Sequence, residues 1–261
     1  MQMPSDLELT SLPIHDDVVS SIKKRVRETA VALRAYAERT SGPRVYAIGD
    51  SHSASFGGNG IVALHVGPVT AYRVGRPDEL RRLIVGAAFG EWPPLRFHAG
   101  LARAVIRPGD VVLMVFGEID VRVHFGPQWP GFGSPEELAC FLAQRLAAET
   151  RALASRTGLF GAVASVVPPS DFLDPDPAFP TNGSIAERVE WTRLVNAELA
   201  AACRRFELPF IDTYADYADE RGVLAARFSD GTVHIRRDAA ATLRIALWRE
   251  FPAFEAQSAL E

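Results

Sequence analysis

Short apolar runs rich in β-branched residues alternate along the chain with longer stretches in which apolar residues recur at helical spacing. The longest of the short runs are almost uninterrupted, which is typical of strands that helices cover on both faces. The predicted strands are 44–48, 69–74, 110–116, 160–167 and 209–212. The predicted helices are 16–38, 77–88, 98–105, 135–156, 185–206 and 237–251. The alternation therefore predicts a three-layer α/β/α sandwich around a mainly parallel, flavodoxin-like sheet of about five strands.

Two long connections rich in proline and glycine, residues 121–134 and 168–184, each follow a predicted strand. Ligands of open α/β sheets bind outside the carboxyl ends of the strands, and long loops at that edge are commonly functional. We therefore expect both connections to border the functional site. The alternative is that they are surface insertions without a role.

The composition indicates one globular domain. With 261 residues, of which 48% are hydrophobic, the chain can bury a large core, and no shift in composition marks a linker. We expect a single domain over residues 1–261, with residues 1–40 as an N-terminal helical extension. Cys140 and Cys203 fall in helical patterns and in no metal or redox spacing, so both are expected to be reduced thiols.

Charge and hydropathy restrict the partners. The net charge of -4 comes from 28 basic and 32 acidic residues without a sustained basic block, so nucleic acid is not an expected partner. No segment reaches about 18 uninterrupted apolar residues. The first residues, MQMPSDLELTSLPIHDD, lack the basic start and apolar core of a signal peptide. We expect a cytoplasmic protein without a membrane partner, and the pattern predicts no particular oligomeric state.

The segment VYAIGDSHSASFGG, residues 45–58, leaves the first predicted strand at Gly-Asp-Ser-His. Ser51 could act there as a nucleophile, or Asp50 and His52 could bind a metal. A nucleophilic serine needs a base, an acid that orients the base, and donors for the oxyanion. His234 has the most suitable context for the base, because it lies in a polar loop with Asp230 four residues before it. Alone, this pair would indicate only a turn aspartate beside an exposed histidine.

These segments together resemble the SGNH (GDSL-type) hydrolase family. Residues 49–51 match the Gly-Asp-Ser of its first block, and His234 matches the histidine of its last block. HVGPVT, residues 65–70, resembles the glycine block between them. The matching residues number about a dozen, although they reach from the first predicted strand to the last loop.

The resemblance implies a role for each matching residue. Ser51 would be the nucleophile, His234 the general base and Asp230 the acid that orients it. The backbone N–H groups of Ser51 and Gly67 would form the oxyanion hole, where a glycine lets the substrate approach closely. The fold implied is the same three-layer sandwich.

VFGEIDVRVHF, residues 115–125, resembles the third block of a bacterial subgroup of this family, which reads Gly-Glu-Ile-Asp followed by an arginine. Three features depart from the family pattern. Ile119 stands where an oxyanion-hole asparagine is usual, and one such donor is typically worth about 100- to 1000-fold in rate. Asp230 precedes His234 by four positions rather than three, and His52 replaces the usual apolar residue after the nucleophile.

Three further residues are candidates for substrate binding. Arg122 and His124 alternate with valines beyond the third predicted strand, so both are expected on one side. Arg122 could bind a substrate carboxylate or phosphate, or it could form an ion pair with Glu118 or Asp120. His52 could contact substrate or cap the turn that follows.

The resemblance and the residues together predict a serine esterase. It would hydrolyse esters of an O-acylated small molecule or sugar through an acyl-serine, with deacetylation as one form of this reaction. The same residues would serve an O-acyltransferase if an alcohol replaced water. A descendant that binds ligand without catalysis is a further alternative, favoured by the missing asparagine.

AIGDSH, residues 47–52, also resembles the Gly-Asp-x-His start of metallophosphoesterases, whose aspartate and histidine bind the first of two metals. A two-metal site needs further ligands, and the chain has neither a Gly-Asp-x-x-Asp nor a Gly-Asn-His block downstream. The esterase prediction is therefore preferred, and no metal or organic cofactor is expected.

Overall fold

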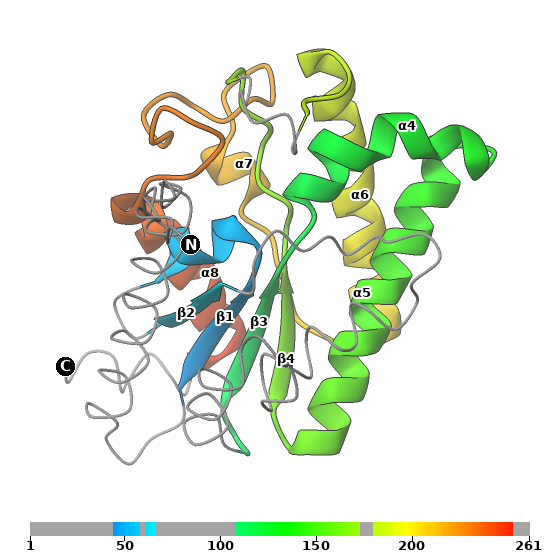
Figure 1. The fold of residues 1–261 in the computed structure, drawn as a ribbon. Coiled ribbons are helices and arrows are strands. Elements are labelled where there is room, and N and C mark those ends of the chain that lie inside the picture. The colour runs from blue at the N-terminus through cyan, green and yellow to red at the C-terminus, as the bar shows by residue number, and fades with distance from the viewer. Residues whose placement is uncertain (1–43, 58–60, 66–107, 173–179, 253–261) are drawn as a thin grey trace, which may run out of the picture.

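Five parallel strands form the sheet in the part of the chain that the structure describes (Figure 1). The computed structural model describes residues 44–57, 61–65, 108–172 and 180–252. The strands lie in the order β2-β1-β3-β4-β5, with the bounds Val45–Gly49 (β1), Ile61–His65 (β2), Val111–Val115 (β3), Phe160–Ala164 (β4) and Phe210–Ile211 (β5). This is the flavodoxin-like order, which reverses between β1 and β3. The predicted fold class is confirmed.

Helices cover both faces of the sheet (Figure 1). The long helices α5 (Pro135–Thr157) and α6 (Ile185–Arg205) pack on one face, and α8 (Ala241–Glu250) packs on the other. The shorter helical segments are η1 (Ser51–Phe56), η3 (Asp120–Phe125), α4 (Gly126–Gln128), η4 (Trp129–Gly131), α7 (Tyr214–Tyr217) and η5 (Arg237–Ala240). None of the described helices is long and apolar enough to cross a membrane.

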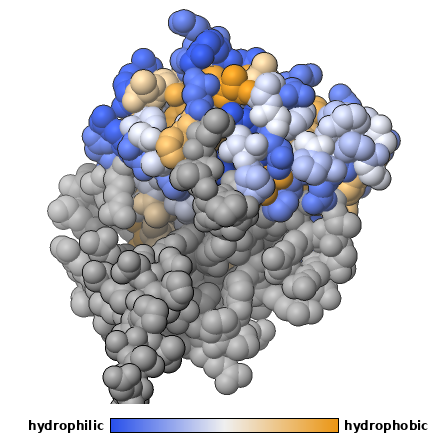
Figure 2. All heavy atoms as spheres, turned by 45° about the horizontal axis from the view of Figure 1, so that its top comes forward, coloured by the Kyte–Doolittle hydropathy of each residue, from blue (hydrophilic) through white to orange (hydrophobic). Residues whose placement is uncertain are grey.

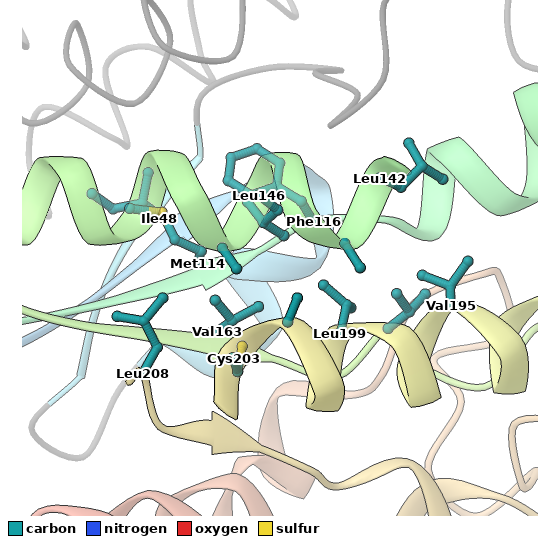
Figure 3. Close-up of a cluster of buried hydrophobic side chains, with 14 of the residues drawn as sticks. Ile48, Met114, Phe116, Leu142, Leu146, Val163, Val195, Leu199, Cys203 and Leu208 are labelled. Carbon is teal, nitrogen blue, oxygen red and sulfur yellow. The ribbon is translucent and has the colours of Figure 1, made fainter. Parts of the chain in front are cut away.

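The core has two layers because successive side chains of a strand point to opposite faces. Ile48, Met114 and Val163 point toward α5 and α6, where they meet side chains such as Leu146 and Leu199 (Figure 3). The alternate strand positions face α8, in a second cluster that includes Ala47, Leu113, Ala162, Leu243 and Leu247. Burial on both faces explains why the strands are continuous apolar runs in the sequence.

Both long helices begin where the sequence predicts, because a serine caps each of them. Ser134 accepts a hydrogen bond from the backbone N–H of Glu137 at the start of α5. Ser184 and Glu187 form a reciprocal capping box at the start of α6. α5 ends at Gly158, whose φ of 70° is a left-handed conformation that favours glycine.

The sequence pattern does not predict β2. Its run, IVALH, is 5 residues long and follows a glycine-rich segment. Periodicity alone cannot assign a short apolar run to a strand or to a buried helical segment. The predicted strand 69–74 and the predicted helices 16–38, 77–88 and 98–105 lie outside the described residues.

Residues 121–134 form short helices, whereas their proline and glycine content predicts an irregular loop. The π-helix η3 is followed directly by α4 and η4. Consecutive helical residues point about 100° apart, so Arg122 and His124 do not lie on one side as the alternation predicts. Arg122 is buried, whereas His124 is partly exposed. That prediction was wrong because a helix replaces the extended chain.

The described parts of the two long connections lie beside each other beyond the strand ends. The backbone N–H of Asn182 donates to the carbonyl of Arg122 at 2.8 Å, and its side-chain amide donates to the carbonyl of Val123 at 2.7 Å. Ser170, near the start of the second connection, donates its hydroxyl to the carbonyl of Thr232 at 3.0 Å. Both connections are therefore tied to the carboxyl edge of the sheet, which faces the top of Figure 1.

Candidate active site

Ser51 is the first residue of η1, and only Asp50 separates it from the end of β1 at Gly49. The side chain of Asp50 caps η1 by accepting a hydrogen bond from the backbone N–H of His52 at 2.9 Å. Ser53 donates both its backbone N–H and its hydroxyl to the carbonyl of Asp50. This compact turn leaves Ser51 partly exposed at the carboxyl edge of the sheet.

His234 lies on a loop that is folded back on itself near the end of the chain. The backbone N–H of Asp230 donates to the carbonyl of His234 at 3.1 Å, and Ser229 and Ile235 form an isolated antiparallel bridge. Val233 and Ile235, on either side of His234, are buried. The loop is therefore anchored on both sides of the histidine, whose own side chain stays partly exposed.

The structure brings Ser51 and His234 together across 183 positions of the chain. Their side chains are joined by a hydrogen bond of 2.9 Å between Ser51 Oγ and His234 Nε2. This is the distance expected between a nucleophile and its base.

The other ring nitrogen of His234 contacts Thr232 and not Asp230. Nδ1 lies 2.9 Å from the Thr232 hydroxyl oxygen, and 3.8 Å from Asp230 Oδ2, which is too far for a hydrogen bond. Thr232 in turn donates its hydroxyl to Asp230 Oδ1 at 2.6 Å. The carboxylate thus reaches the histidine through the threonine hydroxyl.

This arrangement fixes the tautomer of His234. The single hydroxyl proton of Thr232 is donated to Asp230, so the threonine oxygen can only accept from the histidine. The proton of neutral His234 is therefore on Nδ1, and the lone pair on Nε2 faces the Ser51 hydroxyl. His234 is oriented as a base toward Ser51.

His52 lies beside His234 and is 2% exposed. Its Nδ1 lies 3.3 Å from Asp50 Oδ1, and its Nε2 lies 3.0 Å from the carbonyl oxygen of Val233. Burial by itself lowers the pKa of His52, but the hydrogen bond and charge of Asp50, with the charge of Glu118 and the Val233 carbonyl, outweigh burial and raise this pKa to about 9.

The rings of His52 and His234 are neighbours, with centroids 4.9 Å apart. Burial and then the positive charge of His52 lower the pKa of His234 to about 4, against the opposing charges of Asp230 and Asp50. Arg122 lowers it further. His234 is therefore neutral at pH 7, in the form that can accept a proton.

Arg122 pairs with Glu118 in a buried contact. Its Nε donates to Glu118 Oε1 at 2.6 Å and its Nη2 donates to Oε2 at 3.4 Å. The structure therefore shows the ion pair that the sequence offered as one of two readings of Arg122. Ile119, the residue after Glu118, is buried. Its apolar side chain offers no hydrogen-bond donor at the position where SGNH hydrolases usually have an oxyanion-hole asparagine. Gly67, the other predicted oxyanion residue, lies outside the described residues.

Potential metal ligands do not gather in the described part of the chain. No group of three or more His, Cys, Asp or Glu side chains there is arranged to hold an ion. Asp50 and His52, the residues that resemble a metallophosphoesterase motif, contact each other.

Thr232 is the site residue that the sequence does not single out. Threonine two positions before a histidine carries no motif by itself. The signal lay in the spacing, since Asp230 precedes His234 by one position more than in the family pattern, and Gly231, with a φ of 91°, makes room for the longer turn. The Thr232 hydroxyl, which lies within this longer turn, connects the Asp230 carboxylate to His234 Nδ1.

The fold is shared with solved structures. A candidate acylhydrolase from Bacteroides fragilis matches with a TM-score of 0.52 and 14% identity, over 85% of this chain and 94% of that chain. A candidate platelet activating factor from Streptococcus pneumoniae matches with a TM-score of 0.54 and 12% identity, over 92% of this chain and 99% of that chain. The chain has their fold. No protein-family model matches the sequence, and no curated protein matches it by sequence.

A carbohydrate acetylesterase from Sinorhizobium meliloti matches with a TM-score of 0.48 and 15% identity, over 81% of this chain and 99% of that chain. This similarity is too low to add to the fold comparison. The shared fold places the carboxyl edge of the sheet, where Ser51 and His234 meet, at the position where α/β proteins bind ligands.

Proposed function

We propose that the protein is a serine esterase that cleaves O-acyl esters through an acyl-serine intermediate. The observation that carries this proposal is the hydrogen bond of 2.9 Å between Ser51 Oγ and His234 Nε2, in the tautomer that makes His234 a base. The resemblance to SGNH hydrolases and the fold shared with a candidate acylhydrolase support the same reaction class. Fold alone would not, since one fold hosts many reactions.

In the proposed reaction, Ser51 Oγ attacks the ester carbonyl carbon while His234 Nε2 takes the hydroxyl proton. The backbone N–H groups of Ser51 and Gly67 hold the negative charge that forms on the carbonyl oxygen. His234 then gives its proton to the leaving alcohol as the ester bond breaks. Water then attacks the acyl-serine and loses a proton to His234 Nε2. His234 returns this proton to Ser51 Oγ as the bond between Oγ and the acyl carbon breaks and the acid is released.

Asp230 and Thr232 orient His234 in this proposal. Partial burial raises the pKa of Asp230, but the hydrogen bonds from Thr232 outweigh it and leave that pKa below its usual value. The carboxylate is therefore ionised at neutral pH. Its charge stabilises the imidazolium that forms when His234 takes the serine proton, and Thr232 transmits this effect through one hydroxyl.

The proposed substrate is an O-acylated small molecule or sugar. Hydrophilic residues predominate on the described surface at the carboxyl end of the sheet, with smaller hydrophobic areas between them (Figure 2). Such a surface favours a substrate with polar groups. If the hydroxyl of an acceptor replaces water in the second step, the same residues act as an O-acyltransferase.

Labelling with a fluorophosphonate tests the proposal, because this reagent bonds to an activated serine. We expect one adduct in the intact mass of the wild-type protein and none in Ser51→Ala. The matched control is Ser134→Ala, since Ser134 caps α5 and its hydroxyl is bound to the Glu137 backbone N–H and not to the turn that carries Ser51. This variant should label as the wild type does. If the wild type gains no adduct, the esterase proposal fails and ligand binding without catalysis gains weight.

Thr232→Val is expected to lower kcat by about 10- to 100-fold, since a hydrogen bond to a charged group is worth about 1.5 to 3 kcal/mol. Valine has the shape of threonine but cannot bridge the carboxylate and the imidazole. Thr232→Ser keeps the hydroxyl and should retain most of the activity. Steady-state kinetics on an aryl acetate would measure both. Equal kcat values for the valine and serine variants would show that the hydroxyl has no part in orienting His234.

A further inference from the structure

His52 is buried beside the proposed base, yet the proposed reaction gives it no task. We propose that His52 is a positioning residue: as a buried imidazolium between Asp50 and the carbonyl of Val233, it fixes His234 against Ser51 and keeps His234 uncharged in acidic solution. The proposal rests on the function proposed above, since it assigns His234 the work of a base. In this proposal His52, the residue after the nucleophile, acts on the reaction through its positive charge and its hydrogen bonds, and it does not contact the substrate.

The contacts of His52 favour a charged ring. Both of its partners, a carboxylate oxygen and a backbone carbonyl oxygen, can only accept hydrogen bonds. A neutral imidazole has one N–H and would leave one acceptor facing a lone pair. With Asp50 as a carboxylate, both contacts are hydrogen bonds only when both nitrogens carry a proton.

The surroundings of Asp50 point to the same charge. Asp50 is fully buried, and its Oδ2 has no hydrogen-bond partner among the described residues. A buried carboxylate without a cation is costly, and among the described residues His52 is the side chain in contact with Asp50 that can carry a positive charge. The raised pKa of His52, about 9, agrees with this geometry.

The same ring joins the two ends of the site. Asp50 lies at the end of β1, next to Ser51, whereas Val233 lies next to His234, 181 positions away from His52. The hydrogen bond from Nε2 to the Val233 carbonyl therefore holds the histidine loop at a fixed distance from the nucleophile turn. With Val233 buried, the contact acts on the backbone on which His234 is mounted.

The charge of His52 acts on His234 across 4.9 Å, the distance between the ring centroids. A positive charge so near disfavours a second one, so His234 stays neutral to a lower pH than a free histidine. Among the residues that the structure describes, the charged groups that act on His52 are Asp50 and Glu118. Those that face His234 are His52, Asp230, Asp50 and Arg122.

A substrate contact by His52 is disfavoured by the same facts. The side chain is 2% exposed, and both ring nitrogens are bound to protein atoms. A ligand would have to displace the Val233 carbonyl or Asp50 to reach a nitrogen. The ring is therefore available to the reaction only through its charge and its hold on the loop.

The pH dependence of kcat/KM for p-nitrophenyl acetate tests the proposal in the wild type, in His52→Gln, and in the control Thr150→Val. The acid limb reports protonation of the base in the free enzyme. We expect it near the wild-type pKa of His234, about 4. In His52→Gln it should move up by about one pH unit or more, because a cation is lost and the charge of Asp50 is no longer offset. Thr150, which is buried in α5 with its hydroxyl bound to the Leu146 carbonyl, should leave the limb unchanged.

Nuclear magnetic resonance of the ring nitrogens gives a readout that needs no activity. The wild-type His52 ring should carry two protons at pH 7, and the titration of His234 should shift upward in His52→Gln. A neutral His52 ring in the wild type would overturn the proposal even if the variant fails to fold. An unshifted acid limb in a folded variant would overturn it as well.

Failure of the esterase proposal would look different. The wild type would then neither hydrolyse the ester nor gain the fluorophosphonate adduct on Ser51. The ring-nitrogen titrations of His52 and His234 would still decide whether the buried charge exists and acts on its neighbour. A labelled Ser51 with an unshifted limb would refute only the role of His52.

Discussion

Ser51→Ala and His234→Ala are each expected to lower kcat by roughly 10⁴-fold or more. Without its hydroxyl, Ser51 cannot form the acyl intermediate, and without His234 the serine proton has no acceptor at 2.9 Å. The two side chains make one unit, so the double variant should be scarcely slower than either single variant. The measurement is kcat for an aryl acetate in all three variants, with thermal unfolding as the check on folding.

Neither substitution should cost much stability. Ser51 and His234 are both partly exposed, and the anchoring contacts of their segments come from other residues. The matched control for turnover is again Ser134→Ala, in the cap of α5. Losses that add in the double variant would show that Ser51 and His234 act independently, which the proposed mechanism does not allow.

The sheet could be predicted from sequence because its strands are buried on both faces. Burial on both sides requires apolar residues at every position, and such runs stand out from the helical stretches between them. The strands found at Val111–Val115 and Phe160–Ala164 lie within the predicted ranges. Ile61–His65 is as long as β1, but its sequence pattern alone does not assign it to a strand, whereas its pairing with β1 does.

The helices after β3 could not be predicted because their local pattern is ambiguous. The sequence VRVH alternates apolar and polar residues as a half-buried strand does. In the structure its arginine is buried and neutralised by Glu118, four residues before it in the same helical segment. The ion pair allows a charged residue to be buried in a helical segment, whereas the alternation of apolar and polar residues predicts an extended segment.

The sequence was sufficient to predict which residues are the nucleophile and the base, but not the charges and hydrogen bonds that surround them. Gly-Asp-Ser and a late histidine point to Ser51 and His234 whatever surrounds them. The charge of His52 depends on a carbonyl that lies 181 positions away in the chain. The distance from Asp230 to His234 likewise depends on how the turn at Gly231 is folded. Such contacts form only when the loop that carries His234 packs against the end of β1 in the folded protein.

Gly49→Ala is expected to lower the free energy of unfolding by about 4 kcal/mol or more, which is exceptional for a single substitution. A Cβ atom at this position would overlap the carbonyl oxygen of Val115 on the neighbouring strand and lie 2.6 Å from its carbonyl carbon. These are backbone atoms in the centre of the sheet, and they cannot move aside as a side chain could. Denaturant unfolding would measure the loss, with Gly131→Ala as the control, because a Cβ at Gly131 meets nothing within 4 Å.

Gly49 lies two residues before the nucleophile, so a substitution that destabilises the sheet there also affects the turn that carries Ser51. The backbone N–H of Asp50 donates to the Val115 carbonyl at 3.2 Å, so β1 stays paired with β3 up to the residue before Ser51. A side chain on Gly49 would push β1 and β3 apart at the point where their pairing determines the position of Ser51. We therefore expect Gly49→Ala to lose stability and activity together, whereas Ser51→Ala loses activity alone. A folded Gly49→Ala protein with wild-type stability would mean that β1 and β3 do not approach so closely at this point.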